Sequence, residues 1–299
     1  MKRENTHKKT GFTLLELLTT ITVIAILLGF LLPALNMVQK SAMKAKQKAQ
    51  FHSIEIAMEA FSTDMGDYPP SEWDNSTTDG DSTYYGPYSA SQRLAEAMVG
   101  QDGFGFHPDS EFLFSGKDSS GNDLYAPAVD IATDSDNLSA RKGPYLELEN
   151  ANAVKLSNLY GSGNIGSLVD TFVLADMYKI TKNAATGKLT GSPILYYKAD
   201  RSKILHDGSS TSKIYSSTYN VYDSTGTFTS QGLAYLKPLS TKSGQHPLVS
   251  DPAIFYQQTQ NPNFTDPARP YRADSFILQS AGPDSLYGTA DDVFNFDSE

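Results

Sequence analysis

The chain has 299 residues, 39% of them hydrophobic, and a formal net charge of −10 at pH 7. This length and hydrophobic content are typical of a folded protein with a core of its own. Because cysteine is absent, disulfides, thiolate metal sites and cysteine nucleophiles are excluded. The acidic balance argues against a partner such as nucleic acid, whose phosphates a binding protein neutralises over a broad basic surface.

The first predicted element is an apolar helix near the N-terminus. From residue 12 to residue 35 the only charged residue is Glu16. At a rise of about 1.5 Å per residue this segment reaches about 36 Å, which is enough to cross the core of a bilayer. A cleaved secretory signal is the alternative, but no clear A-x-A cleavage site follows the apolar run. We therefore predict a membrane segment. Because Lys and Arg flank it on both sides, their distribution leaves the orientation open, and the larger size of the C-terminal part favours a cytoplasmic tail and an exported domain.

The same helix is expected to continue beyond the membrane, from about Phe12 to about Thr63. The residues between Pro33 and Gly66 are mostly good helix formers and include no further Gly or Pro. In the outer half, apolar residues recur at spacings of three and four, which predicts a face that packs on a core. These residues are Phe51, Ile54, Met58, Phe61 and Met65.

After Gly66 the composition shifts to Ser, Thr, Asp, Gly and Tyr, and short strand-like runs replace the helical pattern. The predicted strands lie within Thr171–Ile180, Pro193–Ala199, Ser275–Ser280 and Val293–Phe296. Ser89–Gly100 is predicted to form a short helix. Asp74–Ser91 and Ser240–Gln245 are predicted to be exposed loops. The predicted fold class is α+β, with an antiparallel sheet laid across the outer half of the long helix.

No enzymatic motif accompanies this fold. The histidines show no HExxH or similar metal spacing, and no nucleophile elbow or P-loop is present. The histidines are His7, His52, His107, His206 and His246. "GSGNIG" (Gly161–Gly166) matches a nucleotide-binding pattern in its letters, but no strand precedes it and no helix pattern follows it. We therefore expect no enzymatic activity.

The N-terminal segment "KKTGFTLLELLTTITVIAILLGFLLPALN" resembles the signature of type IV pilins and type II secretion pseudopilins. The similar features are the basic leader, Gly11 followed by Phe12, Glu16 five positions after Gly11, and Pro33. Four later motifs look like those of major pseudopilins, although insertions at 151–185 and 200–242 make this chain longer. These motifs are "DMGDYPPS", "RLAEAMVG", "KGPYLE" and "SAGPDSLYGTADDVFNF".

The resemblance implies that a prepilin peptidase cuts between Gly11 and Phe12 and methylates the new amino terminus of Phe12. It also implies a type IV pilin-like fold with four segments. These are a leader (1–11), a transmembrane and assembly helix (12–35), the amphipathic half of the same helix (36–65) and an exported head (66–299). Within a filament, Glu16 of one subunit would pair with the Phe12 ammonium of its neighbour, so that each offsets the other's desolvation.

The implied function is that of a structural pseudopilin subunit in a type II secretion-type filament. Its expected partners are the prepilin peptidase, identical or related pseudopilins, an inner-membrane assembly platform and secreted cargo. Before assembly it would cross the inner membrane once, with its N-terminus in the cytoplasm and its head in the periplasm. The alternatives are a type IV pilin for adhesion, motility or DNA uptake, and a single-span anchored protein with a binding or hydrolytic head.

The last loop, "QSAGPDSLYGTADDVFNFD", carries the strongest candidate site for an ion. Asp284, Asp291 and Asp292, with the carbonyls around Ser280 and Leu286, fall in one short turn between two predicted strands. Hard oxygen ligands on such a loop suit calcium, although the EF-hand spacing is absent. The resemblance to major pseudopilins, which bind calcium in this loop, points to Asp284 and Asp291 first, with Asp292 as a ligand or a solvated neighbour. The alternative is an acidic, solvated turn.

Overall fold

The structure is a computed structural model of the chain. It describes residues 11, 13–71, 88–126, 128–130, 134–161, 170–178, 181–182, 186–187, 189–208, 212–220 and 246–297. The chain forms two compact units, Met1–Met43 and Lys44–Glu299. Helices and antiparallel strands combine in the described residues, which confirms the predicted α+β class. The predicted loop Ser240–Gln245 and most of "GSGNIG" lie outside these residues.

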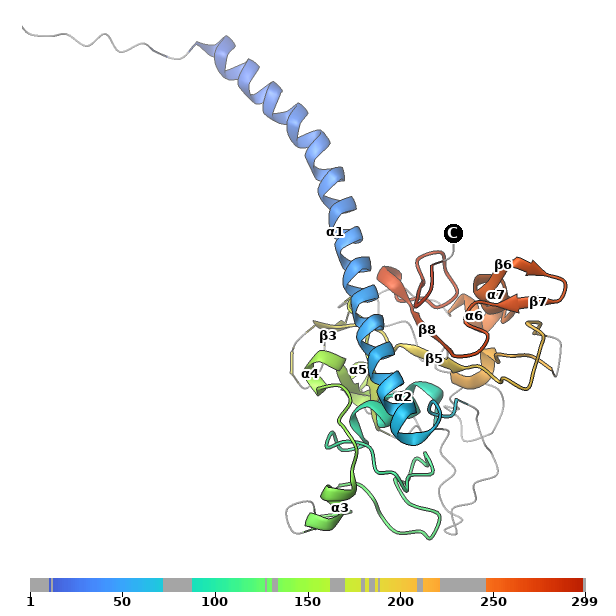
Figure 1. Ribbon diagram of the computed structural model, residues 1–299. Coiled ribbons are helices and arrows are strands. Elements are labelled where there is room, and N and C mark those ends of the chain that lie inside the picture. Colours follow the sequence, from blue (N-terminus) through green and yellow to red (C-terminus); the bar gives the residue numbers. More distant parts are fainter. Residues whose placement is uncertain are drawn as a thin grey trace, which may run out of the picture. The chain divides into compact units, whose positions relative to one another are not determined.

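Helix α1, Leu14–Met65, confirms the long N-terminal helix (Figure 1). It is the one helix in the described part of the chain that is long and apolar enough to cross a membrane, with a mean hydropathy of 2.4 over its most apolar 18-residue window. The described side chains from Thr13 to Ala42 are exposed. An apolar helix surface of this kind needs lipid or another protein to cover it.

The C-terminal part of α1 packs on a three-stranded antiparallel sheet. Its strands are β5 (Leu195–Lys198), β8 (Phe276–Ser280) and β9 (Val293–Phe294), with β8 in the centre. Of the predicted core face, Phe51, Ile54, Met58 and Phe61 are buried to 2% exposure or less, and Met65 packs partly buried against the same cluster. This face of α1 is confirmed as the side that meets the head.

Both faces of this sheet are covered. Tyr196, Phe276 and Leu278 belong to the core cluster that contains α1, whereas Tyr197 and Ile277 belong to a second cluster with helix α7 (Ala253–Thr259). A strand that is buried on both sides has no need of polar residues at alternate positions. This explains why β5 (LYYK) and β8 (FILQS) each begin with three consecutive apolar or aromatic residues.

The predicted antiparallel sheet across the outer half of α1 is confirmed as the three-stranded sheet, and the other described strands form three further antiparallel sheets. The two-stranded sheets pair β1 (Ala153–Lys155) with β2 (Phe172–Leu174), β3 (Thr181–Lys182) with β4 (Leu189–Thr190), and β6 (Gln260–Thr265) with β7 (Ala268–Pro270). The expected strand in Thr171–Ile180 is short because the chain turns after Asp176. The carboxylate of Asp176 accepts hydrogen bonds from the backbone N–H groups of Tyr178 and Ser192.

Helix α2, Ala90–Val99, confirms the predicted short helix. Ser89 and Gln92 form a capping box, in which each side chain bonds the other's backbone N–H at 3.2 Å. The prediction that Asp74–Ser91 is exposed was wrong for its end, because Tyr88 to Ser91 are buried. Ser91 donates to the side chain of Asn220, which draws the start of the helix inward. Residues 74–87 of this predicted loop lie outside the described residues.

The remaining described helices are short. They are α3 (Ser135–Ala140), α4 (Leu148–Ala151), α5 (Leu156–Tyr160), α6 (Pro247–Ser250) and the 3₁₀ turns Ser217–Asn220 and Gly282–Asp284.

The segment after α2 is tied down by a buried carboxylate. Glu96 accepts hydrogen bonds from Ser110 at 2.5 Å, Tyr88 at 2.6 Å, Gln101 at 3.0 Å and Tyr125 at 3.1 Å. Burial raises the pKa of Glu96, and the hydrogen bonds oppose that rise. Three of these donors fasten the segment to α2, and Tyr88 ties the residue stretch before the helix to the same carboxylate.

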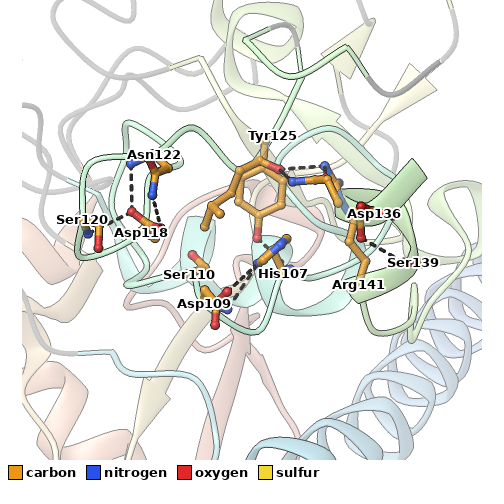
Figure 2. Close-up of polar contacts among 12 residues, drawn as sticks. His107, Asp109, Ser110, Asp118, Ser120, Asn122, Tyr125, Asp136, Ser139 and Arg141 are labelled. Atoms are coloured by element: carbon orange, nitrogen blue, oxygen red, sulfur yellow. Dashed lines mark hydrogen bonds and ion pairs between the residues drawn. The ribbon is translucent and has the colours of Figure 1, made fainter. Parts of the chain in front are cut away.

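A buried ion pair fixes the end of the same segment. Arg141 donates to Asp102 at 2.6 Å, and both side chains are almost fully buried. The guanidinium also lies over the ring of Tyr125, 5.0 Å from its centre. Figure 2 shows Arg141 beside Tyr125, and Asp118 bonded by Ser120 and Asn122 in a local turn. These residues hold the segment with polar contacts that leave few groups available for chemistry.

Candidate functional site

The predicted cleavage site lies between Gly11, which the structure describes, and Phe12, and there is free space around Gly11. A Cβ added to Gly11 would meet nothing within 4 Å, so this chain does not itself require glycine there for space. Phe12, the predicted first residue of the mature chain, lies outside the described residues. A requirement for glycine at position 11 would therefore come from the enzyme that reads it.

Glu16 forms a capping box with Thr13 at the start of α1. The Glu16 carboxylate accepts hydrogen bonds from Thr13 N at 2.9 Å and from Thr13 Oγ1 at 2.8 Å, and Glu16 N donates to Thr13 Oγ1 at 3.2 Å. Thr13 is thus the N-cap residue, and Glu16 lies at the third helical position. The sequence reasoning missed this role, although the T-x-x-E spacing is its known signature. In a single chain, Glu16 stabilises the beginning of the helix.

The C-terminal loop runs from β8 to β9 and is anchored at both ends. At its start, Ser280 Oγ donates to the buried carboxylate of Asp176 at 2.8 Å. At its end, Asp292 Oδ2 accepts from Gln279 Nε2 at 2.8 Å and from Gly288 N at 2.7 Å. Burial raises the pKa of Asp176 to about 7. The role of Asp176 could not be read from the sequence, because its partner Ser280 is 104 positions away.

Tight backbone geometry gives this loop its shape. Gly282 has a φ of +67°, and a Cβ there would lie 2.1 Å from the carbonyl oxygen of Asp291. Only glycine tolerates both that conformation and that approach. The loop therefore brings the backbone around Asp291 back against its own beginning.

The structure places the predicted acidic residues of this loop in different surroundings. Asp292 is half-buried, its Oδ1 atom is buried without a hydrogen-bond partner, and burial raises its pKa to about 7, an effect that the charge of Asp284 reinforces. Asp284 Oδ1 accepts from Leu286 N at 2.9 Å. Asp291 is exposed. Across the described ranges, no three His, Asp or Glu side chains gather closely enough to hold a metal.

Of the four described histidines, His107, His206 and His246 are buried, whereas His52 is exposed, with its Nδ1 atom 3.9 Å from the carboxylate of Glu55. His107 lies near Ser110, but the Ser110 hydroxyl donates to Glu96, so the two do not form a nucleophile and base pair. His206 Nε2 contacts Thr259 Oγ1 at 2.9 Å, and burial lowers the pKa of His206 to about 4. His246 Nδ1 accepts from Tyr287 N at 3.2 Å. His7 lies outside the described residues.

One comparison with known proteins gives a match. The family model described as the prokaryotic N-terminal methylation motif matches residues 6–32, which include Gly11, the capping box and the most apolar part of α1. No curated protein and no solved structure matches the chain. The motif implies processing by a prepilin peptidase and polymerisation of the pilin type, and it points to a structural protein. The chain therefore carries a prepilin-type N-terminal methylation signal.

Proposed function

We propose that this chain is a pseudopilin, a structural subunit that is cut after Gly11, methylated at Phe12 and polymerised through α1 into a type II secretion-type filament. The observation that carries the proposal is the methylation motif at the start of a 52-residue helix. The first part of this helix is apolar and exposed, and its last part packs into the core of the folded head. The exposed apolar part of the helix is long enough to span a membrane before assembly, and the same surface can pack against other subunits in a filament.

The proposed route begins in the inner membrane. The basic N-terminal tail stays in the cytoplasm, the helix spans the bilayer once, and the head faces the periplasm. The peptidase removes residues 1–11, and an inner-membrane assembly platform then adds the subunit to a filament of identical or related pseudopilins. The filament pushes or scaffolds secreted cargo, so the chain's work is mechanical and no catalytic step is assigned to it.

Intact-mass measurement of the mature chain tests this proposal. The chain purified from its native membrane is expected to begin at Phe12 and to carry one added methyl group. A mature chain that keeps residues 1–11 would contradict the proposal and favour a plain single-span anchor. The alternative, a type IV pilin, would be favoured if the chain is processed and if a strain without it loses surface pili but secretes proteins normally.

We also propose that the C-terminal loop binds calcium through Asp284, Asp291 and Asp292. The orphaned, buried Oδ1 atom of Asp292 supports this, because an unpaired carboxylate oxygen suits a cation. Since the described residues bring no three acidic side chains together, neutral oxygens would have to complete the six to eight ligands that calcium takes. Bound calcium would supply the positive charge that offsets the acidic loop.

Calcium is expected to raise the melting temperature of a soluble head that lacks residues 1–35. An ion that binds only the folded state adds about 2.7 kcal/mol of stability at 100 times its Kd. Asp284→Ala and Asp291→Ala should remove most of this gain, whereas Asp274→Ala, at an exposed position before β8, should keep it. Magnesium should substitute poorly, because it demands tight octahedral geometry. Equal melting curves in calcium and in chelator would show that the loop is an acidic turn.

A further inference from the structure

Gln258, on helix α7, presents a buried amide oxygen to the end of the C-terminal loop. Its Nε2 atom donates to the carbonyl oxygen of Thr289 at 2.7 Å, and its Oε1 atom is buried without a hydrogen-bond partner. The amide cannot turn over, because that would place its own oxygen against the Thr289 carbonyl. The orphaned oxygen is therefore held in place by the structure.

Asp292 and Gln258 both donate a hydrogen bond to the carbonyl oxygen of Thr289. Asp292 N also donates to Thr289 O, at 3.3 Å, while the Asp292 carboxylate keeps one oxygen bonded to Gln279 and Gly288 and the other unpartnered. Gln258, Thr289 and Asp292 line one cavity of about 370 Å³. Two side chains from separate elements, each with a buried and unpartnered oxygen, thus line one cavity.

Two buried acceptors without a donor, on residues that line one cavity, are unfavourable. Each buried, unsatisfied polar atom ordinarily costs stability. The described residues that line the cavity include no Lys, Arg or His that would supply a positive charge. A small cation removes both penalties, and calcium accepts amide and carboxylate oxygens together.

We propose that Gln258 Oε1 is a calcium ligand alongside Asp292 Oδ1, so that the ion ties helix α7 to the C-terminal loop. This inference rests on the calcium site proposed above and adds to it a neutral ligand from a different part of the chain. It gives α7 a role beyond its buried residues, because calcium would then hold two elements together and would not merely order one turn.

Calcium titration of the processed full-length chain in detergent, followed by calorimetry, tests this role. Gln258→Ala should weaken calcium binding by about tenfold or more. Gln258→Glu should keep or strengthen binding, because it restores an oxygen and adds a charge. Both variants lose the hydrogen bond to Thr289, so only a ligand role separates them. Asp274→Ala, at an exposed position that does not line the cavity, should bind calcium like the wild type.

The outcomes distinguish the two proposals. If the wild type binds no calcium, the calcium site itself fails, and this inference fails with it. If the wild type binds calcium and Gln258→Ala binds it equally well, the loop site stands and the role of Gln258 is overturned. If Gln258→Ala and Gln258→Glu weaken binding alike, Gln258 acts through its hydrogen bond to Thr289, and the ligand role is again overturned.

Discussion

Replacing Gly11 with valine should leave the chain uncut at full length. A peptidase that binds an extended backbone at the membrane surface must bring its active site close to the backbone of residue 11. A β-branched side chain at that position would block this close approach. The chain itself should tolerate the change, because a Cβ at this position meets nothing within 4 Å. Intact-mass analysis should therefore show complete loss of processing without loss of the folded head.

Gly29 offers a matched control for this experiment. It lies within the apolar part of α1, whereas Gly11 precedes the helix, and a Cβ on Gly29 also meets nothing within 4 Å. Gly29→Val should be processed normally, which would show that the effect belongs to position 11 and not to valine near the membrane. Normal removal of residues 1–11 from Gly11→Val would refute the predicted cleavage site.

The elements that could be predicted from the sequence are those set by local patterns. The run of helix formers in α1 and the Ser89 and Gln92 capping box of α2 each lie within a few residues of the structure they specify. The position of the C-terminal loop was also predictable, because the apolar runs of β8 and β9 flank it. The capping box of Thr13 and Glu16 also follows from a local pattern, T-x-x-E, and could have been predicted. It was missed because Glu16 was interpreted only as a residue that pairs with a neighbouring subunit.

The elements that could not be predicted depend on contacts between distant residues. Arg141 pairs with Asp102 across 39 positions, and Gln258 reaches Thr289 across 31. Neither pair has a spacing that a single sequence reveals, since both follow from how separate segments pack. For the same reason the sequence pointed to the three acidic residues of the last loop and gave no sign of Gln258 or Asp176.

Glu16 has two roles to separate, one inside the subunit and one between subunits. Within the chain its carboxylate caps α1 together with Thr13, and losing such a cap costs about 0.5–2 kcal/mol. In the proposed filament it pairs with the Phe12 ammonium of a neighbour. Removing one member of a buried ion pair costs about 3–5 kcal/mol. The second loss is larger, so it should dominate the behaviour of Glu16 variants.

Glu16→Leu should insert into the membrane at least as well as the wild type, because a costly charge is gone, yet it should fail to assemble. A loss of about 3 kcal/mol per contact corresponds to more than a hundredfold weaker association. Glu16→Gln is the decisive variant, because glutamine can still form the capping box but cannot carry the charge. Cross-linking of filaments should therefore show no ladder for Glu16→Gln, while Thr13→Ala, which loses the cap and keeps the charge, should retain one. A wild-type ladder from Glu16→Gln would reduce Glu16 to a helix cap and remove its role between subunits.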